Sequence, residues 1–269
     1  MPTIPKTGTA WARSLDEYVH TRSLDRPGWA WEFLRRNADY NRECGEHGIG
    51  TQHEAINAKG IHCFQLKQRS TAAEAWGLVA FETPQHAALE ANVFWHPDTT
   101  KRIVRCTAMA SAKPAEGGFD LGSLCGRRSL LIADDAEFAV VQGWQRSARL
   151  MSRGQSLLSG PSHVTFHIEG LDRVGPVSEA LQVLASFKDK SPRLELEFGQ
   201  TGLRLRECLA ALDGHLEGRS YRDIAQVLYG KDRVAETWTS DTRFMKDKVR
   251  RAVERGVELM NGGYRKLLT

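Results

Sequence analysis

The stretch Ser220-Tyr221-Arg222-Asp223-Ile224-Ala225 decides how the last quarter of the chain folds. Ser220 suits the N-cap of a helix, and Asp223 three residues later gives a capping-box-like start. Gly230 is a typical C-terminal stop for the same helix. Ala225 is small enough to let a following helix approach closely. The stretch therefore predicts a short helix between Ser220 and Gly230.

Working outward, a helix is expected on each side of this one. The upstream helix carries an apolar stripe and ends at Gly218: Leu205, Cys208, Leu209, Leu212 and Leu216. The downstream helix is expected from near Thr239 or Ser240 to about Met260. Its apolar side would hold Met245, Val249, Ala252, Val253, Gly256 and Met260. Three helices in this order predict a helix-turn-helix-like domain over residues 200–269.

Basic residues on the last helix are the candidate DNA contacts. They are Arg243, Lys246, Lys248, Arg250 and Arg251, and Tyr221 and Arg222 at the start of the middle helix are further candidates. Arginine can read guanine edges with two hydrogen bonds, whereas lysine more often holds phosphates. These residues predict an interface with double-stranded DNA.

Two features of the same region favour a different interpretation. Arg243–Asp247, Asp247–Arg251 and Arg250–Glu254 have i, i+4 spacing, which is also typical of a solvated, ion-paired helix face. In addition, residues 231–242 separate the middle helix from Arg243, whereas the usual turn takes about three or four residues. We expect Trp238 to anchor this long connection in the core.

The net charge is concentrated at the C-terminal end. From Arg204 onward the chain has 14 Lys+Arg and 10 Asp+Glu, and the preceding 203 residues have 23 of each, so the whole +4 lies in the last part. This distribution favours a polyanionic partner. No apolar run approaches the roughly 20 residues that cross a bilayer, and the N-terminus lacks an apolar signal core. We expect a cytoplasmic protein without membrane contact.

The N-terminal part predicts an aromatic-rich helical segment. A short helix is expected over residues 14–19, followed by a longer one with Asp25 as N-cap and Pro27 in its first turn. Six aromatic residues here are interpreted as core, with a base-stacking platform as the alternative: Trp11, Tyr18, Trp29, Trp31, Phe33 and Tyr40. Residues 45–72 are predicted to be a loop-rich connection.

The rest of the chain predicts mostly strands. Residues 75–81, 93–95 and 103–107 are short apolar runs, and residues 112–118 are a predicted linker. Residues 130–132 and 138–141 suit a hairpin, and residues 164–168 alternate with Val164, Phe166 and Ile168 on the buried face. A helix is expected over residues 178–187, facing the sheet with Leu181, Leu184 and Ala185.

The predicted class is α+β, with a small aromatic-rich helical/β N-terminal domain (10–111), a β-rich middle block (119–199) and the three-helix domain (200–269). Neither a phosphate-binding loop nor a nucleophile elbow is present, so we expect no enzyme and no cofactor. A zinc site would have to combine Cys44, His47, His53, His62 and Cys63, whose spacing matches no paired ligand scheme. No metal is therefore predicted.

Two groups of motifs resemble known families. Residues 24–37 (LDRPGWAWEFLRRN), 75–78 (AWGL) and 93–97 (VFWHP) resemble the proteobacterial transcriptional regulator-like N-terminal domain. Residues 218–225 (GRSYRDIA) and 262–268 (GGYRKLL) resemble the DNA-binding domain of RovC-like transcription factors. Together the two resemblances cover nearly all of the chain.

The resemblance implies a bacterial, cytoplasmic transcriptional regulator, with secretion-system or mobile-element genes as its targets. RNA polymerase or another regulator is an implied further partner. Because helix-turn-helix proteins commonly pair half-sites, we expect a homo-oligomer. Some relatives of the C-terminal domain are antiactivators that bind protein instead of DNA. An antiactivator that uses the same domain without DNA contact therefore stays open as the alternative function.

Overall fold

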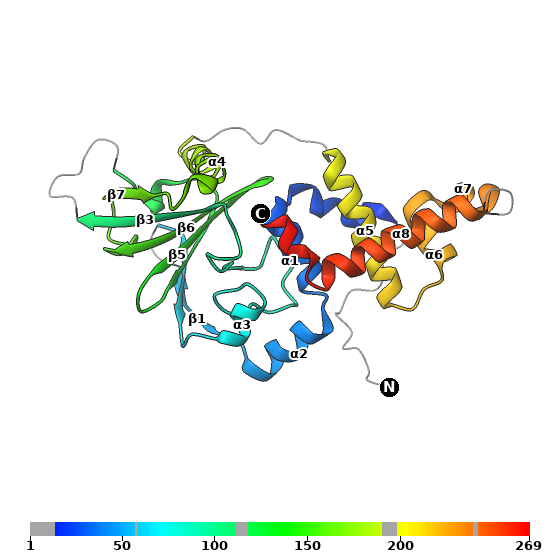
Figure 1. The fold of residues 1–269 in the computed structure, drawn as a ribbon, viewed down its shortest axis with the longest axis horizontal. Helices are drawn as coiled ribbons and strands as arrows, with labels where there is room; N and C mark the ends of the chain where they lie inside the picture. Colours follow the sequence, from blue (N-terminus) through cyan, green and yellow to red (C-terminus); the bar gives the residue numbers. More distant parts are fainter. Residues whose placement is uncertain (1–13, 57–58, 111–117, 190–197, 239–241) are drawn as a thin grey trace. The chain divides into compact units, whose positions relative to one another are not determined.

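The computed structural model describes residues 14–56, 59–110, 118–189, 198–238 and 242–269 (Figure 1). The chain forms two compact units, and each is built from separate parts of the sequence. The helical unit comprises Met1–Asn41, Ala87–Leu89 and Leu194–Leu267, and the sheet unit comprises Arg42–His86, Glu90–Arg193 and Leu268–Thr269. Both ends of the sequence therefore contribute to the helical unit. The α+β class predicted from the sequence is confirmed.

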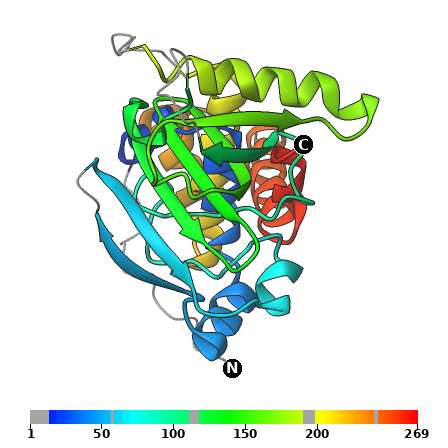
Figure 2. The same cartoon turned by 90° about the vertical axis from the view of Figure 1, so that its left-hand side faces the viewer.

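The sheet unit is built on one mixed sheet in the order β1-β2-β4-β5-β6-β3-β7, which faces the viewer in Figure 2. The strands are β1 (Thr51–Ile56), β2 (Ile61–Leu66), β3 (Ile103–Ala110), β4 (Arg127–Ile132), β5 (Glu137–Gly143), β6 (Arg146–Gly154) and β7 (Ser162–His167). β2 pairs with β4 and β3 with β6 in parallel, and the other neighbours are antiparallel. β1 and β7 are the edge strands.

Helix α4 (Val174–Ala185) packs on this sheet against β6 and β3. It follows the short η3 (Leu171–Arg173) and buries Val177, Ala180 and Leu184, of which Ala180 and Leu184 belong to the main core of the unit. The helix predicted over residues 178–187 is thus confirmed. Its predicted buried face was wrong in one position, because Ala185 is exposed.

Several sequence predictions for the strands were wrong. Residues 45–72 are not a loop-rich connection: β1 and β2 lie there as an antiparallel pair, followed by α3 (Thr71–Ala75). Residues 75–81 and 93–95 are not strands, since α3 ends at Ala75 and Gly77 adopts a positive φ of 79°. Only a single bridge joins Leu78 to Trp95.

Other strand predictions are confirmed. β3 begins at the predicted residue, and β4 and β5 form the predicted hairpin, with Leu131 opposite Phe138. β7 is the predicted strand at residues 164–168, but Phe166 and Ile168 are 39% and 43% exposed. Phe166 is less buried than predicted because β7 is an edge strand with one neighbour, and Ile168 lies just past the end of β7. Most of the predicted linker at 112–118 lies outside the described residues. The short η2 (Leu121–Ser123) follows it.

The helical unit combines N-terminal and C-terminal helices. These are η1 (Leu15–Ser23), α1 (Arg26–Leu34), the start of α2 (Ala38–His47), α5 (Gln200–Leu216), α6 (Tyr221–Tyr229), α7 (Lys231–Thr237), α8 (Thr242–Met260) and η4 (Gly263–Leu267). α5 packs against α8, α6 and η1, while α1 packs against η4 and α8. Helices from both ends of the sequence therefore pack together in this unit.

Helix α1 is capped as predicted, and the aromatic residues of the N-terminal helices lie in the core. Asp25 accepts a hydrogen bond from the Gly28 amide at the start of α1. Tyr18, Trp29, Trp31, Phe33 and Tyr40 are all buried, so they are not available as a base-stacking platform. Trp11 lies outside the described residues.

The connection between the second and last C-terminal helices differs from the prediction. Most of it is helical, because α7 occupies Lys231–Thr237. Val234 is its buried residue, and Trp238 at its end is partly exposed, not fully buried. The sequence signal was weak, since one buried apolar position in two turns gives no visible periodicity.

Candidate nucleic-acid interface

Helix α6 is fixed at both ends by local interactions. The Asp223 amide donates to Ser220 Oγ, and the Ser220 amide donates to Asp223 Oδ2, each over 3.2 Å. This capping box confirms the predicted start of the helix. Gly218 and Gly230 have positive φ angles of 70° and 89°, as their predicted roles as helix stops require.

The apolar side of α8 holds the helix in the core. All six residues predicted for it are buried: Met245, Val249, Ala252, Val253, Gly256 and Met260. Gly256 lies directly against α5, because a Cβ atom at this position would be 2.7 Å from the Cys208 carbonyl oxygen and 2.9 Å from Leu212 Cβ. The crossing of α5 and α8 therefore depends on a residue without a side chain (Figure 1).

The opposite side of α8 carries the predicted DNA contacts. Lys246, Lys248, Arg250 and Arg251 are all exposed. Of Arg243 only the backbone is described, as part of α8. At the start of α6, Arg222 is exposed and Tyr221 is partly buried.

Two of these cations have partners within the chain. Arg250 Nη1 donates to Glu254 Oε1 over 2.7 Å, and its Nε lies 3.5 Å from Asp247 Oδ1. The hydrogen bond and charge of Glu254 raise the pKa of Arg250. Lys248 Nζ lies 4.4 Å from the centre of the Tyr229 ring, a cation–π contact between α8 and α6. For Arg250, the ion-paired interpretation of the helix face is the observed one.

Lys246, Arg251 and Arg222 differ from these two. Within the described part of the chain, none of the three makes a hydrogen bond, ion pair or ring contact. The predicted pair of Asp247 with Arg251 does not form, because Asp247 faces Arg250 instead.

Charge is unevenly distributed along α8. Residues 242–251 contain five cations and one carboxylate, whereas residues 252–260 contain Arg255 with Glu254 and Glu258. Arg255 and Lys266 both pair with Glu258 in that second half. The N-terminus of a helix carries a positive partial charge, so α8 itself does not stabilise cations near its start. An anionic ligand bound at this end would stabilise them.

Phe244 is a feature of this surface that sequence reasoning missed. Phe244 lies two residues after the first residue of α8, and its side chain is 71% exposed. The sequence already indicated this exposure, because Phe244 does not fall on the apolar stripe that begins at Met245. An exposed phenylalanine on a basic helix face offers an apolar contact to a ligand.

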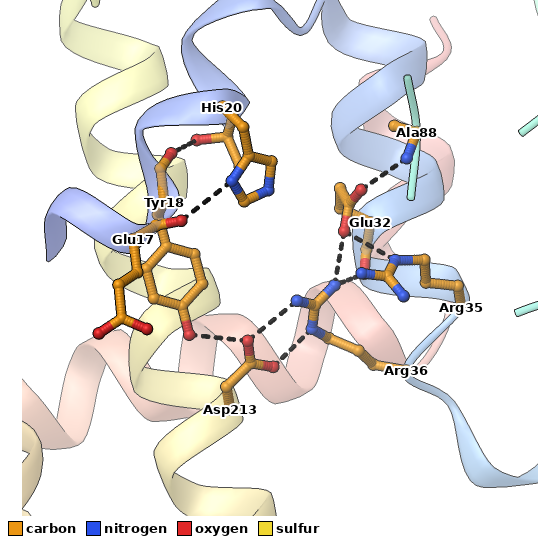
Figure 3. A network of polar contacts seen from close by, with 9 residues as sticks. Glu17, Tyr18, His20, Glu32, Arg35, Arg36, Ala88 and Asp213 are labelled. Atoms are coloured by element: carbon orange, nitrogen blue, oxygen red, sulfur yellow. Dashed lines mark hydrogen bonds and ion pairs between the residues drawn. The ribbon is translucent and has the colours of Figure 1, made fainter. Parts of the chain in front are cut away.

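A network of buried polar groups supports α5 from the side of the N-terminal helices (Figure 3). Arg36 donates from Nε to Asp213 Oδ1 over 2.5 Å and from Nη2 to Asp213 Oδ2 over 2.9 Å. The Tyr18 hydroxyl also donates to Asp213 Oδ2, over 2.8 Å. Burial and then the Asp213 carboxylate raise the pKa of Tyr18, so its hydroxyl stays protonated as the donor. Asp213 on α5 is thus held by two residues from the N-terminal segment.

Glu32 is the second carboxylate of this network. Its Oε2 accepts from Arg36 Nη1 over 2.7 Å and from Arg35 Nε over 2.8 Å, while its Oε1 accepts from the Ala88 amide over 2.7 Å. Burial acts to raise the pKa of Glu32, but the two guanidinium groups and the amide outweigh it and lower the pKa to about 2. Glu32 is therefore charged at neutral pH and lies at the centre of this network (Figure 3).

The sheet unit contains a separate cavity of about 720 Å³. Its charged groups are largely paired with each other: Arg105 contacts Glu169 and Asp98, Arg69 contacts Glu74, and Arg153 lies near Asp135. Leu66, Val79, Phe138 and Met151 are among the apolar residues that line it. This arrangement offers few unpaired groups to a ligand, so the surface of α8 is the stronger candidate site.

The side chain of His53, one of the residues considered for zinc, lies outside what the structure describes. Among the described residues, no group of three or more His, Cys, Asp or Glu side chains is placed to hold a metal ion. Cys44 Sγ lies 3.6 Å from the Glu82 carbonyl oxygen, and Cys63 is part of the sheet core. None of the described helices has the length and apolar character to cross a membrane.

Comparison with known proteins gives two matches to family models. Residues 167–269 match the RovC DNA-binding domain, described as a type VI secretion system (T6SS) transcription factor, DNA-binding domain. Residues 11–79 match the proteobacterial transcriptional regulator-like domain. No significant match to a curated protein was found. Each matched segment includes parts of both compact units, and the domain limits expected from the sequence remain a prediction.

Proposed function

Because this chain is a transcriptional regulator with a DNA-binding domain of the RovC type, we propose that it binds duplex DNA with the N-terminal half of α8. The observation that carries the proposal is the surplus of exposed cations there, of which Lys246 and Arg251 have no partner among the described residues. Matches to transcription-factor families also indicate a role without catalysis.

In this proposal α6 and α8 form a helix-turn-helix-like pair in which α7 replaces the short turn. The N-terminal residues of α8 would enter the major groove, as in other proteins of this kind. Arg243, Arg250 and Arg251 would read base edges or hold phosphates, and Lys246 and Lys248 would hold phosphates. Tyr221 and Arg222 at the start of α6 would contact the DNA backbone. Arg250 would exchange its exposed carboxylate partners for the DNA, at a small cost.

The test is DNA affinity as a function of salt, measured by fluorescence anisotropy with genomic fragments enriched by the full-length protein. Lys246→Ala and Arg251→Ala should each weaken binding and lower the slope of log affinity against log salt by about 1. Arg255→Ala is the matched control, because Arg255 is an exposed arginine of the same helix but pairs with Glu258. Salt-independent binding, or an equal loss in the control, would contradict the proposal.

The second candidate function is an antiactivator that binds another regulator through the same surface. Exposed Phe244 favours this candidate, since an aromatic anchor surrounded by polar groups is typical of protein interfaces. Capture of a partner regulator together with the absence of a DNA shift would support it.

Chromatin immunoprecipitation identifies the genes to which the tagged protein binds inside the cell. We propose that the protein acts in the bacterial cytoplasm on secretion-system or mobile-element genes. The wild type should enrich such genes, and the Arg251→Ala variant serves as the control.

We further propose that the chain forms a homo-oligomer through the sheet unit. β7 is an edge strand, and Phe166, Ile168, Leu171 and Val174 on and after it are exposed apolar residues, Leu171 to 91%. A second copy could cover them by strand pairing, and RNA polymerase is the alternative partner for this surface. The mass of the full-length chain in solution, measured by light scattering, should fall to that of one copy on Leu171→Lys with Ile168→Lys.

A further inference from the structure

Phe244 is a large apolar side chain that stays mostly exposed near the start of α8. The 71% exposed side chain stands apart from the apolar side of α8, which Met245 and the buried residues after it already fill. A phenylalanine ring has no hydrogen-bonding group, so it can recognise a partner only by apolar or ring contact. The basic surface around it must therefore be matched with an apolar feature of the same ligand.

On the surface of α8, Lys248 lies about one turn from Phe244 and Arg251 about two turns from it. At about 100° per residue, these positions lie roughly 40° and 20° around the helix from Phe244, so the three share one side. Their charges would place the ring against a polyanion. In the major groove of B-DNA the apolar feature is the C5 methyl group of thymine, and phenylalanine is one of the residues that contacts it.

We propose that Phe244 contacts a thymine methyl group in the major groove and so sets a thymine preference at one position of the binding site. This inference rests on the proposed DNA-binding function. A methyl contact suits the position of Phe244 near the start of α8, because recognition helices touch base edges with their N-terminal residues. Insertion of an apolar side chain between two base pairs is typical of minor-groove binders. We expect α8 in the major groove, so we do not propose insertion for Phe244.

The experiment uses the full-length chain and DNA selected by it from a random duplex library. Wild-type protein should enrich thymine at one position, and Phe244→Ala should lose the preference there while keeping the others. Deoxyuridine is then placed at that position in the selected duplex, which removes only the methyl group. Wild-type affinity should fall about fourfold, as expected for one buried carbon. Phe244→Ala should bind the two duplexes equally.

Two further variants separate this role from other effects. Lys246→Ala should weaken binding to the thymine and deoxyuridine duplexes by the same factor, because it contacts phosphates. Phe244→Leu keeps an apolar side chain and should retain part of the discrimination. Since Phe244 is exposed, all Phe244 variants should keep the wild-type melting temperature, which excludes unfolding as the cause of any loss.

The outcomes distinguish the inference from the function on which it rests. If the wild type binds no DNA, the proposed function fails, and the inference fails with it. If the wild type binds but shows equal affinity for the two duplexes, or Phe244→Ala keeps the wild-type difference, the inference alone is wrong. 2-Aminopurine placed beside the contact position fluoresces more strongly when it is unstacked. A rise in its fluorescence that requires Phe244 would show that the ring inserts between base pairs, and this result would also overturn the inference.

Discussion

Arg36 and Asp213 are 177 residues apart in the sequence and are joined by two hydrogen bonds in the helical unit. Arg36 also binds Glu32, so one guanidinium group links α1 to α5 through two carboxylates. A buried charge that loses its partner cannot regain the hydration it had in water. The stability of the unit therefore depends on this residue much more than on an arginine at the surface.

Replacing Arg36 tests this dependence. Arg36→Met keeps most of the side-chain volume but leaves Glu32 and Asp213 with fewer partners, and we expect a loss of about 3–5 kcal/mol in the free energy of unfolding. The measurement is urea denaturation followed by circular dichroism. Arg42→Met is the control, because the Arg42–Glu46 pair is exposed and 3.9 Å long, and should change stability by at most about 0.5 kcal/mol. Equal losses in the two variants would contradict the role of the network.

Glu32 makes the same unit sensitive to acid. Its pKa is lowered to about 2 in the folded chain, against roughly 4.3 in an unfolded one. A lowered pKa contributes stability that is complete above the unfolded value and is lost as pH falls toward the folded value. Stability should therefore fall by roughly 3 kcal/mol between about pH 4.5 and 2. In Glu32→Gln, urea titrations at several pH values should show a smaller decrease across this window.

Among the secondary-structure elements, those with strong local signals were predictable from sequence. α6 has a capping residue and glycine stops, and α8 has an unbroken apolar stripe, so both were located closely. β1 and β2 were missed because polar and glycine residues between 45 and 72 hide strands that pairing with each other stabilises. α7 was missed because Val234 is its only buried residue in the described part.

The candidate site was predictable to a similar extent. Helical geometry gave the side of α8 that carries the cations. It could not show that Arg250 has partners while Arg251 has none among the described residues, because side-chain pairing at i+3 and i+4 is a choice between nearly equal alternatives. Nor could it show the link between Arg36 and Asp213, since nothing in the sequence relates positions so far apart.

The crossing of α5 and α8 gives a prediction for one element pair. Gly256→Ala would ordinarily stabilise a helix, but here the new methyl group would meet the Cys208 carbonyl and Leu212 at less than 3 Å. We expect a loss of about 1–3 kcal/mol from overpacking. Gly45→Ala in α2 is the matched control, because a Cβ there meets nothing within 4 Å, and should be neutral or stabilising. Chemical denaturation of both variants checks the difference in sign.

For the whole molecule, the important feature is that the helical unit takes residues from both ends of the sequence. The C-terminal helices of this unit depend on contacts from the N-terminal segment. Arg36 and Tyr18 donate hydrogen bonds to Asp213, and the Asn37 side-chain amide donates to the Met260 carbonyl. Arg26 donates in addition to the Lys266 carbonyl in η4. The part of the chain that carries the candidate interface is thus incomplete without residues 14–41.

A fragment of residues 198–269 should show this incompleteness. Alone it should contain less helix than it does in the full-length chain, and its amide NMR signals should be broad and poorly dispersed. The reason is that the core surface covered by α1 in the full-length chain is exposed in the fragment. Adding a peptide of residues 14–41 in trans should restore the helix signal in circular dichroism, and the same peptide with Arg36→Met should restore it much less. A fragment that folds stably alone would show that the N-terminal segment is dispensable.

The shared origin of the helical unit also sets an order of events during synthesis. Residues 14–41 leave the ribosome first, yet Asp213 follows them by more than 170 residues. At about 5–20 residues per second, this delay is roughly 10–35 s, during which the buried aromatic residues of α1 have no permanent neighbours. The sheet unit, whose strands are made in the interval, can fold meanwhile. If α8 binds DNA as proposed, a nascent chain can do so only after Asp213 and α8 have been made, and products terminated before α8 would lack that ability.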